Sequence, residues 1–97
     1  MEADVIIVGG GLYGCSVAYN LMKHGATDVV LLERGSICSG GTSKSCAVVR
    51  THYSVLANMA HAVASLKIFQ DFNEIVGGDA GFQRTGYLAL GPEEHRE

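Results

Sequence analysis

The chain opens with a short apolar strand that ends in glycines and leads directly into a helix. Within residues 4–16, DVIIVGGGLYGCS, three glycines form the pattern G-x-G-x-x-G: Gly9, Gly11 and Gly14. The first permits a tight turn, the second lets the backbone approach a pyrophosphate, and the third lets helix and strand pack closely. The N–H groups and positive dipole end of the helix then face the phosphates. This stretch predicts a dinucleotide site.

Two further segments extend the pattern into a βαβ unit. Apolar residues recur at helical spacing from Leu12 to about His24, and Gly25 supplies a left-handed stop. A second strand is predicted from Asp28 to Glu33 around the apolar run VVLL. Unbroken apolar runs, here and at residues 5–8, are typical of parallel strands buried on both faces. We therefore predict an α/β, Rossmann-like fold with parallel strands.

An acidic residue stands at the carboxyl end of the second predicted strand. Glu33 follows Gly14 by nineteen residues, the spacing at which an acid accepts hydrogen bonds from the ribose of an adenine dinucleotide. A helix-capping or solvated glutamate is the alternative interpretation. Because an acid disfavours a 2′-phosphate, NADP is the least expected dinucleotide.

A loop of small residues follows where a nicotinamide-binding unit would turn quickly into another helix. Residues 34–46, RGSICSGGTSKSC, bring the backbone close to a ligand and offer hydroxyl and N–H donors. A flexible surface linker is the alternative. The apolar residues 47–49 directly after it predict a buried segment, which would anchor the loop. The donors in question are Gly40, Gly41, Thr42, Ser43 and Ser45.

The second half of the chain predicts one long helix and one strand. Apolar residues at spacings of three and four run from about Ser54 to Val76, with Ser54 as N-cap and Gly77-Gly78 as the stop. Residues 82–90, FQRTGYLAL, are a strand candidate with Gly86 as a bulge or kink.

Composition narrows the class of partner and compartment. A net charge of -3 and a pI near 5.7 argue against nucleic acid, and no apolar run approaches the roughly 18 residues of a membrane helix. The first strand follows residue 1 too soon for a secretory signal, which favours a cytoplasmic protein. The three cysteines form no CxxC pair, which predicts reduced thiols at Cys15, Cys38 and Cys46. No second ligand lies at metal spacing from the histidines, which predicts that no metal binds at His24, His61 or His95.

Four blocks in order resemble one family. VIIVGGGLYGCSVAYNL, VVLLERG, SGGTSKSCAVVRTHY and FQRTGYLAL are similar to the N-terminus of the FAD-dependent amine and amino-acid oxidoreductases, the D-amino-acid oxidase family. The nearest branch is that of the sarcosine oxidase β-subunit and dimethylglycine dehydrogenase. The resemblance spans nearly the whole chain. It is more specific for the family than for the substrate.

The resemblance implies a set of FAD contacts. The three glycines, with Leu12 and Tyr13, would hold the pyrophosphate, while Glu33 would bind the ribose and Arg34 would lie beside the adenine. Two loop segments would run past the pyrophosphate and the flavin ring. These segments are Gly41, Thr42 and Ser43, and then Ser45, Cys46 and Ala47.

The same resemblance implies one substrate contact. Arg50 matches the position that pairs with the substrate carboxylate in monomeric sarcosine oxidases, and a bidentate guanidinium–carboxylate bond would fix an amino acid over a flavin. Tyr53 would lie near that pocket. From the residues alone, Arg50 could equally be a surface arginine.

Two departures from the family pattern matter. Some members carry a histidine in the Gly-Thr-Ser loop that bonds covalently to the flavin, whereas residues 43–45 hold none, so we expect non-covalent FAD. Monomeric relatives also place an arginine three residues before the carboxylate-binding one, and here that residue is Ala47. A dehydrogenase is therefore at least as well supported as an oxidase.

The length of the chain predicts that it holds only part of a family member. Family members run to several hundred residues, so residues 1–80 would be the N-terminal part of an incomplete FAD-binding domain and residues 81–97 the start of a substrate-domain strand segment. The function expected is oxidation of the C–N bond of a secondary amine or amino acid, such as sarcosine, dimethylglycine or proline, within the remainder of the enzyme or a partner subunit. Alternatives are an NAD-dependent dehydrogenase module and a non-catalytic nucleotide-binding fragment that completes a partner subunit.

Overall fold

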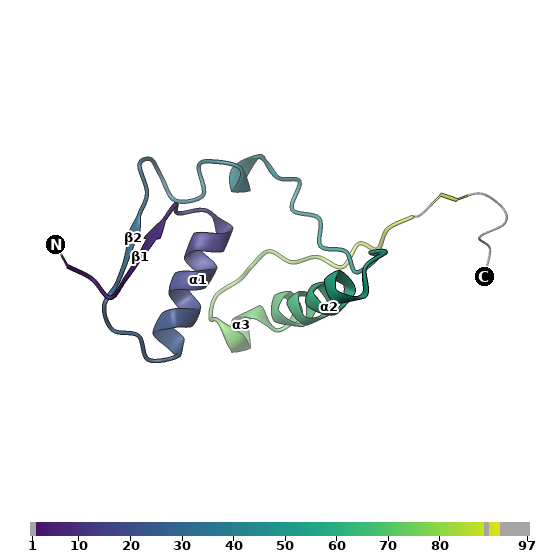
Figure 1. Cartoon of the computed structure of the whole chain (residues 1–97). Coiled ribbons are helices and arrows are strands. Elements are labelled where there is room, and N and C mark those ends of the chain that lie inside the picture. Colours follow the sequence, from purple (N-terminus) through teal and green to yellow (C-terminus); the bar gives the residue numbers. More distant parts are fainter. Residues whose placement is uncertain (1, 89, 92–97) are drawn as a thin grey trace. The chain divides into compact units, whose positions relative to one another are not determined.

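The computed structural model describes residues 2–88, 90 and 91, and it consists of two units, Met1–Val48 and Val49–Glu97. Along the chain the order of elements is β1, α1, β2, a single 3-10 turn, α2 and α3 (Figure 1).

The first unit is a βαβ unit. Strand β1 (Val5–Val8) pairs in parallel with β2 (Val29–Leu32), in a register that sets Val5 opposite Val29. Helix α1 (Leu12–Lys23) makes the crossover and packs against both strands (Figure 1). Gly25, at φ +94°, follows the helix in the left-handed conformation. The predicted parallel α/β unit is confirmed.

Helix α1 packs on the sheet through one of its faces. Cys15, Ala18 and Leu21 are half-buried, at the spacing of one helical face. The prediction that strand β1 is buried on both faces is wrong, because Ile6 is 55% and Val8 85% exposed. These two side chains alternate with Val5 and Ile7, which are half-buried. In the described part of the chain no hydrophobic side chain is fully buried.

The second unit carries helices α2 (Leu56–Gln70) and α3 (Phe72–Ile75). A single helix over residues 54–76 is therefore wrong. Asp71, at φ -108° and ψ 27°, has left the α-helical region and separates the two. The predicted apolar spacing is nevertheless seen within α2, where four side chains on one face are half-buried: Met59, Ala62, Leu66 and Phe69.

The start of the helical region differs from the prediction, whereas its end agrees with it. Val55, with extended backbone, is the N-cap of α2, and no side chain caps the helix, so the prediction of Ser54 as N-cap is wrong. At the other side Gly77 and Gly78 have φ of +90° and +88°, as the predicted stop requires.

Two predicted extended segments are not formed as expected. Residues 82–88 and 90 contain no strand, and residue 89 lies outside the described residues. A strand requires a partner, and the described sheet contains β1 and β2 alone. The predicted buried segment at 47–49 is also wrong, because Ala47 is exposed and Val48 is 68% exposed.

Residues 92–97, which include His95, lie outside the described residues. None of the helices in the described residues has the length and apolar character needed to cross a membrane.

Candidate dinucleotide-binding site

The glycine-rich turn closes tightly between β1 and α1. Gly9, at φ +106°, donates its N–H to the carbonyl oxygen of Leu32 at 2.8 Å and so continues the sheet by one bond. A Cβ atom on Gly14 would collide with the carbonyl oxygen of Gly9. The third glycine of the pattern is therefore required by the close packing of the helix on the turn, the role expected for it.

The start of α1 presents backbone donors. The first intrahelical bond runs from Cys15 N–H to the Gly11 carbonyl oxygen at 3.0 Å. Leu12 N–H, ahead of it, donates to Thr42 Oγ1 at 3.0 Å. Among the described residues, none accepts a hydrogen bond from the N–H of Gly11, Tyr13 or Gly14. Such donors at the positive end of a helix fit a pyrophosphate.

Glu33 stands beside this turn, one residue beyond β2. Its Oε2 accepts the N–H of Gly10 at 2.8 Å, and its Oε1 accepts the N–H of Gly35 at 2.8 Å. The bond from Gly10 above all, then that from Gly35, lowers the pKa of the Glu33 carboxyl below 4.5, and the positive charge of Arg34 contributes least. An ionised acceptor therefore lies at the carboxyl end of β2.

The small-residue loop is bonded to the turn at two points. Cys38 N–H donates to the Gly10 carbonyl oxygen at 2.8 Å, and Thr42 Oγ1 accepts from Leu12 N–H as described above. Thr42 opens the 3-10 turn η1 (Thr42–Lys44), in which Ser43 Oγ donates to the Gly40 carbonyl at 3.1 Å. Loop and helix start are thus joined across thirty residues.

The other described residues predicted to contact FAD are not held to the glycine turn by hydrogen bonds of this kind. Ser45 closes η1, and its Oγ accepts the N–H of Ala47 at 3.1 Å. Within the described residues, no hydrogen bond joins Ser45, Cys46 or Ala47 to the glycine turn. Arg34 is exposed, and the side chain of Tyr13 is 89% exposed.

Arg50 and Tyr53 belong to the second unit. The guanidinium carbon of Arg50 lies 5.1 Å from the centroid of the Tyr53 ring, within the range of a cation–π contact. A guanidinium that lies over a ring keeps the N–H groups at its edge available for a planar acceptor. Both side chains are exposed. Further along the chain, Tyr87 meets His52 edge to face, with ring centroids 6.2 Å apart.

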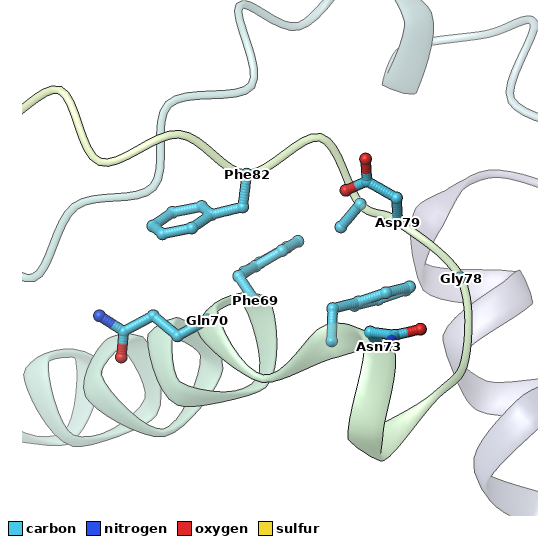
Figure 2. Close-up of a pocket in the computed structure, with 8 residues that line it drawn as sticks. Phe69, Gln70, Asn73, Gly78, Asp79 and Phe82 are labelled. Carbon is cyan, nitrogen blue, oxygen red and sulfur yellow. The ribbon is translucent and has the colours of Figure 1, made fainter.

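The second unit also contains a hollow of about 540 Å³. Phe82 and Phe69 stack at its side, with ring centroids 6.2 Å apart and planes inclined by 23° (Figure 2). No residue predicted for cofactor or substrate lies among its lining residues, which are Phe69, Gln70, Phe72, Asn73, Gly78, Asp79, Ala80 and Phe82.

Sequence reasoning missed two residues of the site, Gly10 and Cys38. Gly10 occupies a position that G-x-G-x-x-G leaves open, yet its N–H donates to Glu33 and its carbonyl oxygen accepts from Cys38. The run of three consecutive glycines was the available signal. No comparable signal marks Cys38, whose contribution comes from its backbone.

Comparison with known proteins places this sequence in a family. Residues 4–97 match the sequence model of one protein family, which is described as DAO, FAD dependent oxidoreductase. The chain belongs to this family. Its members are FAD-dependent, which agrees with the predicted cofactor class and with the donors at the start of α1.

Three relatives show how much of such a protein the chain represents. It is 38% identical to the mitochondrial pyruvate dehydrogenase phosphatase regulatory subunit of Mus musculus, over 98% of this chain and 11% of that protein. It is 40% identical to sarcosine oxidase subunit beta of Rhizobium meliloti, over 90% and 21%. With the mitochondrial dimethylglycine dehydrogenase of Rattus norvegicus it shares 31% identity, over 98% and 11%. The chain thus spans between a tenth and a quarter of these relatives, and no solved structure matches it.

Proposed function

We propose that this chain binds FAD without a covalent bond and forms the N-terminal part of an oxidoreductase that acts on the C–N bond of a secondary amine or amino acid. The observation that carries the proposal is the convergence of three segments at one turn: the glycines after β1, Glu33 after β2, and Thr42 in the following loop. Sarcosine, dimethylglycine and proline are the substrates to test first. Because Ala47 stands where monomeric relatives have an arginine, the proposal includes a dehydrogenase as well as an oxidase.

The chain's own residues would hold the cofactor by hydrogen bonds. N–H groups at the start of α1 would bind the pyrophosphate, and Glu33 would accept hydrogen bonds from the adenosine ribose. The loop residues Gly41, Thr42 and Ser43 would lie beside the pyrophosphate. The segment Ser45 to Ala47 would lie beside the flavin ring. When bound, FAD supplies an acceptor for hydride at the flavin N5.

Reconstitution with FAD tests the cofactor. The chain is titrated with FAD and, separately, with NAD, and bound flavin is followed by its visible absorption. A yellow complex that releases unmodified FAD on denaturation supports non-covalent binding. Binding of NAD in preference to FAD would favour the nicotinamide alternative, and flavin that stays with the denatured chain would contradict the non-covalent assignment.

Arg50 is proposed to bind the substrate carboxylate, with Tyr53 beside it. In a protein that contains the remainder of the enzyme, Arg50→Lys and Arg50→Ala should raise KM for sarcosine far more than they lower FAD content. A substrate amine without a carboxylate should be little affected, because it has no group for the guanidinium. Arg84→Ala, an exposed arginine of the same unit, is the matched control. Equal loss of FAD and of sarcosine affinity would contradict this role.

A second, non-enzymatic function is favoured by one comparison. A relative that is 38% identical carries the name of a regulatory subunit, so the chain could serve to complete or regulate a partner subunit. Copurification with a larger chain, with activity appearing only in the mixture, would support this function. Turnover by a protein that contains this chain and no partner would exclude it.

The division into residues 1–80 of the FAD-binding domain and residues 81–97 of the substrate domain stays a prediction, as does a cytoplasmic location. Two of the three relatives above are named as mitochondrial proteins. Fractionation of cells that express a tagged copy of the whole protein decides the compartment.

A further inference from the structure

Gly10 is enclosed to an unusual degree in this chain. It is the one buried residue among those that the structure describes. A Cβ atom placed on it would meet Ile37 Cδ1 at 2.7 Å and Glu33 Cβ at 3.0 Å. Its carbonyl oxygen accepts the N–H of Cys38. Its own N–H is therefore screened from water by the same residues that surround it.

The acceptor for that N–H is a side chain from another segment. Glu33 Oε2 lies 2.8 Å from Gly10 N, while Oε1 lies 2.8 Å from Gly35 N. The carboxylate thus bridges the turn after β1 and the turn after β2. Because a buried N–H without an acceptor is costly, the bond from Gly10 has a structural reason that is independent of any ligand.

The bridge leaves Glu33 able to bind a ribose as well. An ionised carboxylate offers about four lone-pair positions, and the two backbone bonds use two of them. A residue that served the ribose alone would not need either backbone bond. Two roles, one toward the turn and one toward the ligand, are therefore separable by experiment.

We propose that Glu33 is a positioning residue of the glycine turn: its carboxylate fixes Gly10, and through it the N–H groups that follow, in the orientation that binds a pyrophosphate, whether or not a ribose is present. The functional consequence rests on the proposed FAD site. The positioning itself does not, since it concerns bonds within the chain.

A pH titration by NMR tests the bridge without any variant or ligand. In the ¹⁵N-labelled 97-residue chain, the amide resonances of Gly10 and Gly35 should shift together as Glu33 is protonated. The pKa of this carboxyl is lowered by folding, so its contribution to stability is present above pH 4.5 and is lost as pH falls through the lower, folded-state value. A Gly10 amide that does not titrate with Glu33 overturns the proposal.

Ligands with and without a ribose separate the two roles. Inorganic pyrophosphate and ADP are titrated into the wild-type chain and into Glu33→Gln. Removal of a negative charge would by itself strengthen the binding of both anions. Loss of the bridge instead predicts weaker binding of both, by about tenfold, the scale of one hydrogen bond to a charged group. In Glu33→Gln these two effects oppose each other, so a net loss of binding identifies the bridge, while a variant that keeps the charge measures the loss of the bridge alone.

Two variants complete the design. Glu33→Asp keeps the charge but is one methylene shorter, so it cannot bridge both N–H groups and should weaken pyrophosphate binding like Glu33→Gln. Glu74→Gln, an exposed carboxyl of α3, should change nothing. If Glu33→Asp weakens ADP but leaves pyrophosphate unchanged, Glu33 serves the ribose alone and the proposal fails. If the wild type binds neither ligand, the proposed FAD site fails, while the pH titration still decides the bridge.

Discussion

The two units of this chain are held by different kinds of contact. In the first, Glu33 and Thr42 bond to the backbone of residues 23 and 30 positions away. In the second, Phe69 stacks on Phe82, and the side-chain bond from Gly81 N–H to Asp79 is local. Hydrogen bonds are directional and fix the orientation of N–H groups, whereas stacked rings hold segments together without orienting a hydrogen-bond donor. The proposed cofactor site lies in the unit whose N–H donors are held in a fixed orientation.

The largest expected effect comes from Gly14→Ala. Its new Cβ would collide with the Gly9 carbonyl oxygen, so the first unit should lose stability by about 1–3 kcal/mol, while the second should be unaffected. Hydrogen exchange of the amides of β1 and α2 measures the two units separately. Gly41→Ala is the control, because Gly41 has helical φ and ψ of -59° and -31° and nothing within 4 Å of a Cβ. Similar losses in both variants would contradict this assignment.

Thr42→Val is expected to cost about 1 kcal/mol in the first unit, the usual value of a side-chain cap at a helix start. Valine keeps the shape of threonine but cannot accept the Leu12 N–H. Thr42→Ser keeps the acceptor and should behave like the wild type. Exchange of the Leu12 amide is the measurement. Unchanged exchange in Thr42→Val would show that the loop is not held to the helix by this bond.

In the second unit, the Phe69–Phe82 pair is expected to contribute about 0.5–1.5 kcal/mol beyond the area that it buries. A double-mutant cycle with Phe69→Leu and Phe82→Leu, followed by exchange of the α2 amides, isolates that coupling. The amides of β1 should not respond. Additive effects of the two substitutions would mean that the contact between the rings contributes no coupling energy.

The smallest effect is a gain. Val55 is the N-cap of α2 and offers no acceptor, so Val55→Ser should stabilise α2 by some tenths up to about 1 kcal/mol. Ser54→Ala is the matched control and should be neutral, since Ser54 precedes the cap. A loss in Ser54→Ala together with no gain in Val55→Ser would restore Ser54 as the cap.

The sequence by itself determined the local features of this protein. The βαβ order, the tight turn at Gly9 and the stops at Gly25 and Gly77 depend on residues close together in the chain, because they follow from apolar spacing and from the φ angles open to glycine. The family followed from the same residues, since four ordered blocks of sequence carry it.

Tertiary structure alone decided which distant groups meet. The Gly10–Glu33 and Leu12–Thr42 bonds depend on how β2 and the following loop close on the turn, and no spacing rule specifies which oxygen takes which N–H. Residues 82–88 show the converse. This segment is predicted as a strand from its residues, but a strand exists only through hydrogen bonds to a partner. The glycine pattern thus marked the turn, and the closure of the fold determined which of its N–H groups the chain itself binds.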